Sequence, residues 1–451
     1  MEQLKWIILA CAVVMYALVI KFNDRKVWFT SIAGLIVVVL GFIFPGYIFN
    51  LPEDILALED VFSVHNYAFI HCVQDIINWN VLMIYLGSMT IASLFIYSKV
   101  PSRIAGDIIG HSKNTGLAMV AILAMTGIIS IFVENVATVL VMAPIGLALC
   151  KKLKINPSFF MIGLAVMSNL EGTATLVGDP PSMIFASYAG YNFNDFFIHN
   201  GHLSIFFIVQ TGLIAGCVFF YFFFAKAGKN IIQEPKEKVV SWFPLVLLIV
   251  MIVGLACVSF IHTSFEYLSG LFVLCLGVVG LLWYRMFEKK TNNEVWAVVK
   301  ELDWETIFFL IGIFIVIGVI SETGLLKSLA LFLADVTGGS KVLGFFIVLF
   351  VSIIISGFVD NVPYIIAMLP VADMMAKNMG INGELYMFAL LVGSCLGGNL
   401  TPYGASANVV AMGIVKKEGY PMKFTGWLKV GVPFTVITTA AAAVVLWALW
   451  A

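Results

Sequence analysis

The sequence has little charge. Of its 451 residues only 11% are Asp, Glu, Lys or Arg, whereas soluble globular domains have about 25%. The net charge is −1 and no long basic run occurs, so the composition excludes a soluble enzyme and a nucleic-acid-binding protein. Hydrophobic residues make up 61% and the mean hydropathy is +1.03. Apolar runs of about 17–20 residues, the length that crosses a bilayer, recur along the chain and predict an all-α polytopic membrane protein.

The sequence also lacks the usual signals of catalysis and metal binding. The seven cysteines contain no CxxC pair, so neither a disulfide framework nor a zinc site is indicated. HExxH is absent, and no serine motif has a partnered base. The histidines lie in predicted loops: outer loops hold His65, His71, His199, His202 and His262, and an inner loop holds His111. We therefore predict no enzymatic activity and no organic cofactor.

Apolar runs predict about ten spanning helices and two hairpins. Uninterrupted runs cover 4–20, 27–44, 79–97, 203–225, 242–260, 267–284, 305–320 and 430–449. Four more stretches are apolar but broken by polar residues: 116–150, 156–190, 342–376 and 383–415.

Basic residues mark the inner loops of a membrane protein. Lys21, Arg25 and Lys26 predict an inner loop after the first helix, and the acidic loop 45–78, which has no Lys or Arg, is predicted outside. Stretch 116–150 is basic at both ends, so it must turn once. Each arm is roughly 22–27 Å long, short of the roughly 30 Å hydrocarbon core, which favours a re-entrant hairpin over two full crossings. Both termini are predicted outside an inner or plasma membrane.

The chain contains an internal repeat, which divides it into 1–225 and 226–451. Residues 132–136 (FVENV) recur 226 positions later as 358–362 (FVDNV). With the same offset, Ser168, Gly172, Thr175 and Gly178 recur as Ser394, Gly398, Thr401 and Gly404. A constant offset over roughly a hundred residues indicates duplication.

The two repeats are predicted to have opposite orientations. The first contains hairpin 116–150 and broken helix 156–190, and the second contains hairpin 342–376 and broken helix 383–415. Basic residues surround the first hairpin much more densely than the second, so the second hairpin should open outward. Inverted repeats with interrupted helices are typical of secondary transporters that work by alternating access.

The helix breaks carry the candidate site. They place carboxylates, amides, hydroxyls and open backbone groups at membrane depth, where such groups can replace the hydration shell of an ion. The candidate substrate- or ion-binding residues are Glu134, Asn135, Thr138, Glu171, Gly172, Thr173, Thr175, Asp179, Asp360, Asn361, Gly398, Asn399, Thr401, Ser406 and Asn408. Of these, Asn135 and Asn361 are candidate Na⁺ ligands.

Four of the candidates are carboxylates, and no Lys or Arg lies inside an interrupted stretch. Cations, protons or helix N-termini must therefore compensate their charge. Helix capping is an alternative role for several candidates. Asp179 precedes Pro180 and fits an N-cap, Ser406 is the expected cap of the last half-helix, and Asn135 and Asn361 fit caps of the second hairpin arms.

Four motifs resemble those of the ion transporter superfamily: 132–146 (FVENVATVLVMAPIG), 169–182 (NLEGTATLVGDPPS), 358–371 (FVDNVPYIIAMLPV) and 395–410 (CLGGNLTPYGASANVV). Its members include arsenite permeases, NhaD-type sodium/proton antiporters, the P protein, citrate–metal transporters and divalent-anion:sodium symporters. The resemblance implies a homodimer in which hairpins and broken helices form an elevator-like moving domain. In the dicarboxylate branch the tips carry Ser-Asn-Thr; here the Asn is kept, an acid replaces Ser and valine replaces Thr.

The leading functional hypothesis is a secondary transporter coupled to Na⁺ or H⁺, either a cation/proton antiporter or an arsenite-type efflux protein. The alternative is a Na⁺-coupled symporter of citrate or a dicarboxylate, and a passive channel is a third class. In each case the expected partners are a small inorganic or organic ion and the lipid bilayer.

Overall fold

The computed structural model describes residues 2–22, 25–49, 51, 55, 61–225, 237–261 and 265–451. The first half contains α1 (Glu2–Lys21), α2 (Lys26–Ile43), α3 (Pro45–Ile48), α5 (Val61–His71) with the π-helical turn η2 (Cys72–Ile76), α6 (Trp79–Tyr97), α7 (Val100–His111), α8 (Thr115–Ser130), α9 (Asn135–Leu153), α10 (Ser158–Gly172), α11 (Pro180–Ala189), η3 (Asn194–Phe196), the strands β1 (Ile198–His199) and β2 (His202–Leu203), and α12 (Ile205–Phe224).

The second half repeats this order without the strands. It contains α13 (Phe243–Val258), α14 (Leu268–Met286), α15 (Asn292–Lys300), α16 (Trp304–Glu322), α17 (Leu325–Val336), α18 (Lys341–Ser356), α19 (Asn361–Asn378), α20 (Gly383–Gly397), η4 (Gly398–Leu400), α21 (Ser406–Lys417) and α22 (Phe424–Trp450). From α6 to α11 and from α16 to α21, equivalent helices begin 225 or 226 residues apart. The duplication seen in the sequence is therefore a duplication of structure.

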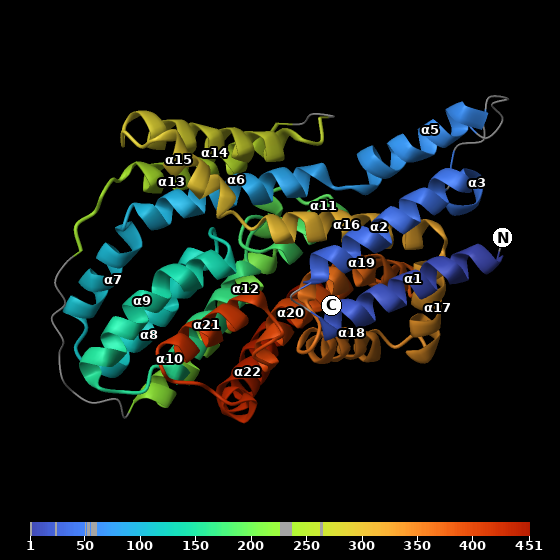
Figure 1. Ribbon diagram of the computed structural model, residues 1–451. Coiled ribbons are helices and arrows are strands. Elements are labelled where there is room, and N and C mark those ends of the chain that lie inside the picture. Colours follow the sequence, from blue (N-terminus) through green and yellow to red (C-terminus); the bar gives the residue numbers. More distant parts are fainter. Residues whose placement is uncertain are drawn as a thin grey trace.

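The described helices match the predicted membrane plan. Eight of them are long and apolar enough to cross a bilayer, and shorter apolar helices include α8, α10, α13 and α18. If each broken helix counts once, the crossing elements are α1, α2, α6, α10–α11, α12, α13, α14, α16, α20–α21 and α22. Helices α8–α9 and α18–α19 form the two hairpins, which lie on either side of the view in Figure 1.

Helices of the two repeats pack against each other in matching pairs. Helix α6 packs on α14, and its counterpart α16 packs on α2. Gly87 and Gly312, 225 residues apart, allow this close approach. A Cβ at Gly87 would lie 2.5 Å from the Val273 carbonyl oxygen, and one at Gly312 would lie 2.8 Å from that of Thr30. Small residues at helix contacts are a common way to bring backbones together in membranes.

The hairpins interlock with the broken helices. Each first arm packs on the broken helix of its own repeat, α8 on α10 and α18 on α20. Each second arm packs on the broken helix of its own repeat and also reaches that of the other repeat, so that α9 packs on α10 and α21, and α19 packs on α20 and α11. This packing brings both hairpin tips to the centre of the protein, and Glu134 at the first tip is only 8% exposed. The first tip is thus a buried re-entrant turn, as predicted, whereas the second tip is partly exposed, with the Asp360 side chain 19% exposed.

Contacts between loops agree with their predicted grouping. Loops predicted inside touch one another through Lys99–Glu237 (3.2 Å) and Lys151–Glu418 (2.6 Å). On the other side, Trp450 near the C-terminus donates to the carbonyl of Leu203, beside a loop predicted outside (3.1 Å). Which group faces the cytoplasm remains a prediction. The acidic residues Glu53, Asp54, Glu59 and Asp60 and the predicted outer histidine His262 lie outside the described residues.

Candidate functional site

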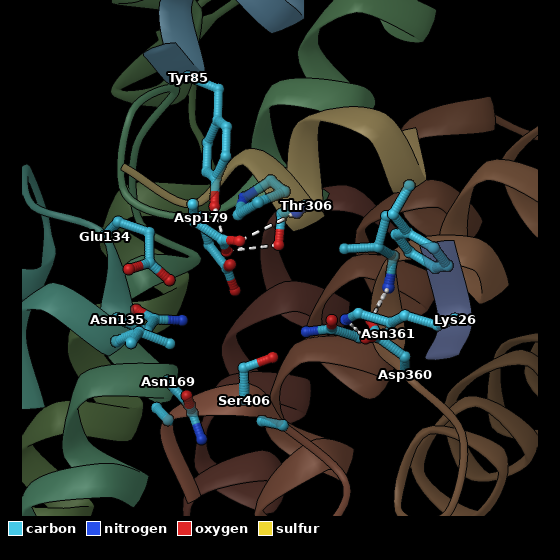
Figure 2. Close-up of a pocket in the computed structure, with 17 residues that line it drawn as sticks. Lys26, Tyr85, Glu134, Asn135, Asn169, Asp179, Thr306, Asp360, Asn361 and Ser406 are labelled. Carbon is cyan, nitrogen blue, oxygen red and sulfur yellow. Dashed lines mark hydrogen bonds and ion pairs between the residues drawn. The ribbon is translucent and has the colours of Figure 1, made fainter. Parts of the chain in front are cut away.

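Both hairpin tips and both helix breaks line one cavity (Figure 2). It has about 40 Å³ of room for the centres of water molecules, and about 10–15 Å³ of such room holds one water. The cavity therefore fits a small ion with a few waters. Its lining is Glu134, Asn135 and Val136; Asp360, Asn361 and Val362; Asn169, Asp179 and Pro180; Ala405, Ser406 and Ala407; and Lys26, Tyr85, Asp303, Thr306 and Phe309.

The acidic residues, rather than the asparagines, cap the second hairpin arms. Glu134 is the N-cap of α9 and its Oε2 accepts from the Ala137 N–H (3.0 Å). Asp360 is the N-cap of α19 and its Oδ1 accepts from the Val362 N–H (3.1 Å). The capping alternative for Asn135 and Asn361 was thus wrong by one residue. Figure 2 shows the two asparagine amides pointing toward each other across the cavity.

The first helix break contributes a carboxylate. Asp179 is the N-cap residue of α11 with Pro180 at the first helical position, as predicted, but its side chain makes no capping hydrogen bond. Its carboxylate instead lies on the cavity lining together with Asn135. Helix capping therefore does not explain Asp179, and its carboxylate faces the cavity.

The second break differs from the prediction at Ser406. Helix α21 begins at Ser406, and Ala405 is its N-cap, so the predicted cap is wrong by one residue. The expectation failed because this helix start has no side-chain cap at all. The Ser406 hydroxyl is left to line the cavity. A neighbouring pocket shares Asp360, Ala405 and Ser406 with the cavity and extends to Val19 and Ile20 at the end of α1.

Two threonines hold the hairpin tips in equivalent ways. Thr175 donates to the carbonyl of Ile131 (2.5 Å), and Thr401 donates to the carbonyl of Gly357 (2.5 Å). Donors and acceptors are both 226 residues apart. These predicted site residues lie outside the cavity lining and fasten each tip to the broken helix of its own repeat.

An asparagine cluster joins the two breaks. The Asn169 amide nitrogen donates to the side-chain oxygens of Asn399 and Asn408 (2.8 Å each). Asn408 in turn donates to the carbonyls of Gly398 and Thr401 (2.9 Å each). The Asn169 side-chain oxygen is buried and has no hydrogen-bond partner among the described residues. Asn169 lines the cavity and was missing from the sequence-based candidates, although it lies in a helix break that the sequence marks.

The remaining candidates lie around the cavity rather than in it. Thr138 donates to the carbonyl of Val133 (3.1 Å), and Thr173 donates to that of Asn169 (3.3 Å). Glu171 is fully buried on another side of α10, where one carboxylate oxygen accepts from Gln210 (2.6 Å). Gly172 packs directly against Asn135, and a Cβ there would overlap the amide group.

Lys26 is a cavity residue that was not among the candidates predicted from the sequence. Its ammonium lies 3.1 Å from the Asp360 carboxylate and 4.7 Å from the centre of the Phe309 ring. From its place after the first apolar run, Lys26 was predicted to lie in an inner loop. The structure instead has it as the first residue of α2, in the cavity. No local pattern could reveal this pair, because the two residues are 334 positions apart.

The start of α16 also lines the cavity. Asp303 caps this helix by accepting from the Thr306 N–H (3.0 Å), and its second oxygen accepts from the Thr306 hydroxyl (2.5 Å). Tyr85 of α6 also donates to Asp303 (3.3 Å). Hydrogen bonds therefore satisfy this carboxylate on the cavity wall.

Among the described lining residues, four carboxylates face one lysine. Buried carboxylates are costly unless cations, protons or hydrogen bonds compensate them. Lys26 compensates Asp360, and Tyr85 and Thr306 hydrogen-bond Asp303. Glu134 and Asp179 have no ion pair in the described chain. The cavity is thus chemically suited to a small cation or a proton.

Paired hairpins and broken helices around a polar cavity, in a bundle of spanning helices, define a multi-pass membrane transporter. Residues 15–393 match the CitMHS family, described as citrate transporters, and the chain belongs to this family. The membership confirms the resemblance to the ion transporter superfamily.

Known relatives are transporters and membrane proteins. The chain is 31% identical over 399 residues to an uncharacterized transporter of Mycobacterium tuberculosis, covering 87% of this chain and 89% of that protein. It is 31% identical over 403 residues to a 46 kDa membrane protein of Mycobacterium leprae, with coverage of 87% and 90%. It is 23% identical to the human P protein over 444 residues, covering 81% of this chain and 53% of that longer protein.

Two solved transporters share the fold. The Alcanivorax borkumensis YdaH transporter, reported to have an unusual topology, matches with a TM-score of 0.62 and 14% identity, covering 92% of this chain and 97% of that chain. Neisseria gonorrhoeae MtrF, reported within a class of antimetabolite efflux pumps, matches with a TM-score of 0.55 and 14% identity, covering 92% and 94%.

Proposed function

We propose that this protein is a secondary active transporter that couples the movement of a small ion to Na⁺ or H⁺. The observation that carries the proposal is the charge of the cavity. Glu134, Asp179 and Asp360 come from both hairpin tips and one helix break, and a single lysine faces them. A cation or proton at this position lowers the cost of burying these carboxylates.

The transported cation would bind between Glu134, Asn135 and Asp179. Asn135 and Asp179 line the cavity together, and the unpartnered oxygen of Asn169 lies on the cavity side in Figure 2. Carboxylate and amide oxygens suit hard cations such as Na⁺. Cation/proton antiport and arsenite-type efflux both fit a cavity of this size.

Alternating access would move the hairpins and broken helices against the helix pairs α2–α16 and α6–α14. Both tips are fastened to their own breaks through Thr175 and Thr401, so tips and breaks can move together. We further propose that two copies of the chain form a homodimer, with these helix pairs as the stationary part.

A second candidate is symport of citrate or a dicarboxylate with Na⁺. The family description favours it. Lys26 offers a positive charge, and the N-terminal ends of α11 and α21 line the cavity, where they can receive a carboxylate. The cavity as it stands is too small for citrate, so this candidate requires a wider cavity in another state.

Ion-driven flux into proteoliposomes tests the proposal. With Na⁺ and pH gradients imposed separately, we expect uphill movement of the substrate ion in the wild type and loss of it in Asp360→Asn. Glu237→Gln is the matched control, because it removes an exposed carboxylate that pairs with Lys99 away from the cavity. Flux that never runs uphill on either gradient would favour a channel, and full flux in Asp360→Asn at every pH would remove this residue from the mechanism.

Citrate, succinate and arsenite, each added to the purified protein with and without Na⁺, distinguish the candidates by their effect on its thermal stability. Stabilisation of the purified protein by Na⁺ alone supports an exchanger. Stabilisation that requires both Na⁺ and a particular carboxylate supports the symporter.

A further inference from the structure

The two hairpin tips are equivalent in sequence and backbone but differ in their partners. Glu134 and Asp360 each cap the second arm of a hairpin and each precede an asparagine that faces the cavity. Asp360 has a lysine ammonium at 3.1 Å. Glu134 forms no ion pair with any described residue. A strict duplication would give two equal cation positions, and the structure does not keep this symmetry.

The ammonium of Lys26 is held in place by the helices around it. Lys26 begins α2, which packs tightly on α16 at Gly312. Its ammonium also lies over the ring of Phe309, also on α16, a contact that attracts a cation to the ring face. The side chain is only 12% exposed. The position of this charge is therefore set by the α2–α16 pair.

The equivalent position in the other repeat carries no charge. Helix α14 corresponds to α2 in order and packs on α6 as α2 packs on α16. Helix α14 begins at Leu268, after Tyr267. The first-repeat half of the cavity thus has Glu134 and Asp179 without a built-in cation, while the second-repeat half has its own.

We propose that the Lys26 ammonium occupies the cation position of the second repeat, so that the cavity takes up one mobile cation instead of two. This inference rests on the proposed function, in which the mobile cation binds at Glu134, Asn135 and Asp179. A second cation at Asp360 would lie within a few ångströms of the ammonium, where like charges repel strongly in a buried site. The lysine therefore sets the number of ions bound.

The test counts cations bound per protomer in the purified full-length protein. Bound Na⁺ is counted by equilibrium binding of radioactive sodium, and protons are counted from the pH change of a weakly buffered sample. We expect the number of bound Na⁺ plus bound H⁺ per protomer to be one higher in Lys26→Gln than in the wild type. In the double variant Lys26→Gln with Asp360→Asn the sum returns to the wild-type count. Lys99→Gln, which removes an exposed lysine paired with Glu237, leaves the count unchanged.

An unchanged sum in Lys26→Gln, in protein that remains monodisperse on size exclusion, overturns the inference. So does an extra cation that persists when Asp360→Asn is added, because that cation would bind elsewhere. If the wild type takes up no cation but Lys26→Gln gains one that depends on Asp360, the mobile-cation site of the proposed function fails while the role of Lys26 stands.

Discussion

The contact between Gly172 and Asn135 makes a sharp prediction for Gly172→Ala. A Cβ at Gly172 would lie 2.9 Å from both the Cγ and the amide nitrogen of Asn135, closer than real Cβ contacts. These atoms lie at the end of the short Asn135 side chain, so Asn135 can relieve the overlap by turning its amide group away from Gly172. Overpacking of this kind costs about 1–3 kcal/mol, and we expect the lower end of that range in the free energy of unfolding.

Ion binding should suffer more than stability. If Asn135 no longer faces the cavity, one charge-assisted contact worth about 1.5–3 kcal/mol is lost, which weakens affinity about 10- to 150-fold. The assay is ion-dependent flux in proteoliposomes, fitted for the half-saturating concentration of the coupling ion, beside the thermal unfolding midpoint of the same protein.

Gly413→Ala is the matched control for this experiment. Gly413 lies in α21, and a Cβ there has no neighbour within 4 Å. Because alanine is favoured over glycine in a helix by about 1 kcal/mol, this variant should keep its affinity and gain slightly in stability. Wild-type affinity in folded Gly172→Ala would refute the claim that this glycine positions Asn135 for the ion.

Two more predictions concern the hairpin tips and the end of α5. Thr175→Val and Thr401→Val should each destabilise the protein by about 0.5–1.5 kcal/mol, because each removes the same hydrogen bond to a hairpin carbonyl; an effect confined to one of them would contradict their equivalence. His71 bridges Asp75 (2.7 Å) and Glu322 (2.8 Å). Burial alone would lower the pKa of His71, but its bonds to Glu322 and Asp75 raise that pKa above 6.5. Its contribution to stability should be complete below pH 6.5 and lost as pH rises through the raised pKa. His71→Gln should flatten this part of the profile of unfolding temperature against pH, and an unchanged profile would contradict it.

The sequence by itself determined where the helices and their breaks lie. Long apolar runs have few ways to satisfy their backbone in a membrane other than helices, so α6, α12 and α16 match their predicted ranges closely. The repeat also foretold equivalent contacts, such as those of Thr175 and Thr401. The apolar runs did not reveal α7 and α17, because these are short amphipathic helices without a long apolar run.

Helix geometry, and then packing, decided which polar residues face the cavity. Asn169 and Glu171 are two positions apart in the same break, and at 3.6 residues per turn they lie on nearly opposite faces of α10. Packing turned Asn169 toward the cavity and Glu171 toward Gln210. The one-residue shift at Ser406 has a similar origin, because the start of α21 is fixed by the fold rather than by a capping side chain.

Tertiary structure alone decided the pairing of Lys26 with Asp360. These residues are 334 positions apart, one at the start of α2 and the other at a hairpin tip. The spacing of residues predicts only contacts between residues that are near in sequence. This ion pair instead forms because α2 packs on α16 and the tip of the second hairpin reaches the start of α2. The repeat supplied two equal acidic tips, and the packing of helices distant in sequence made them different.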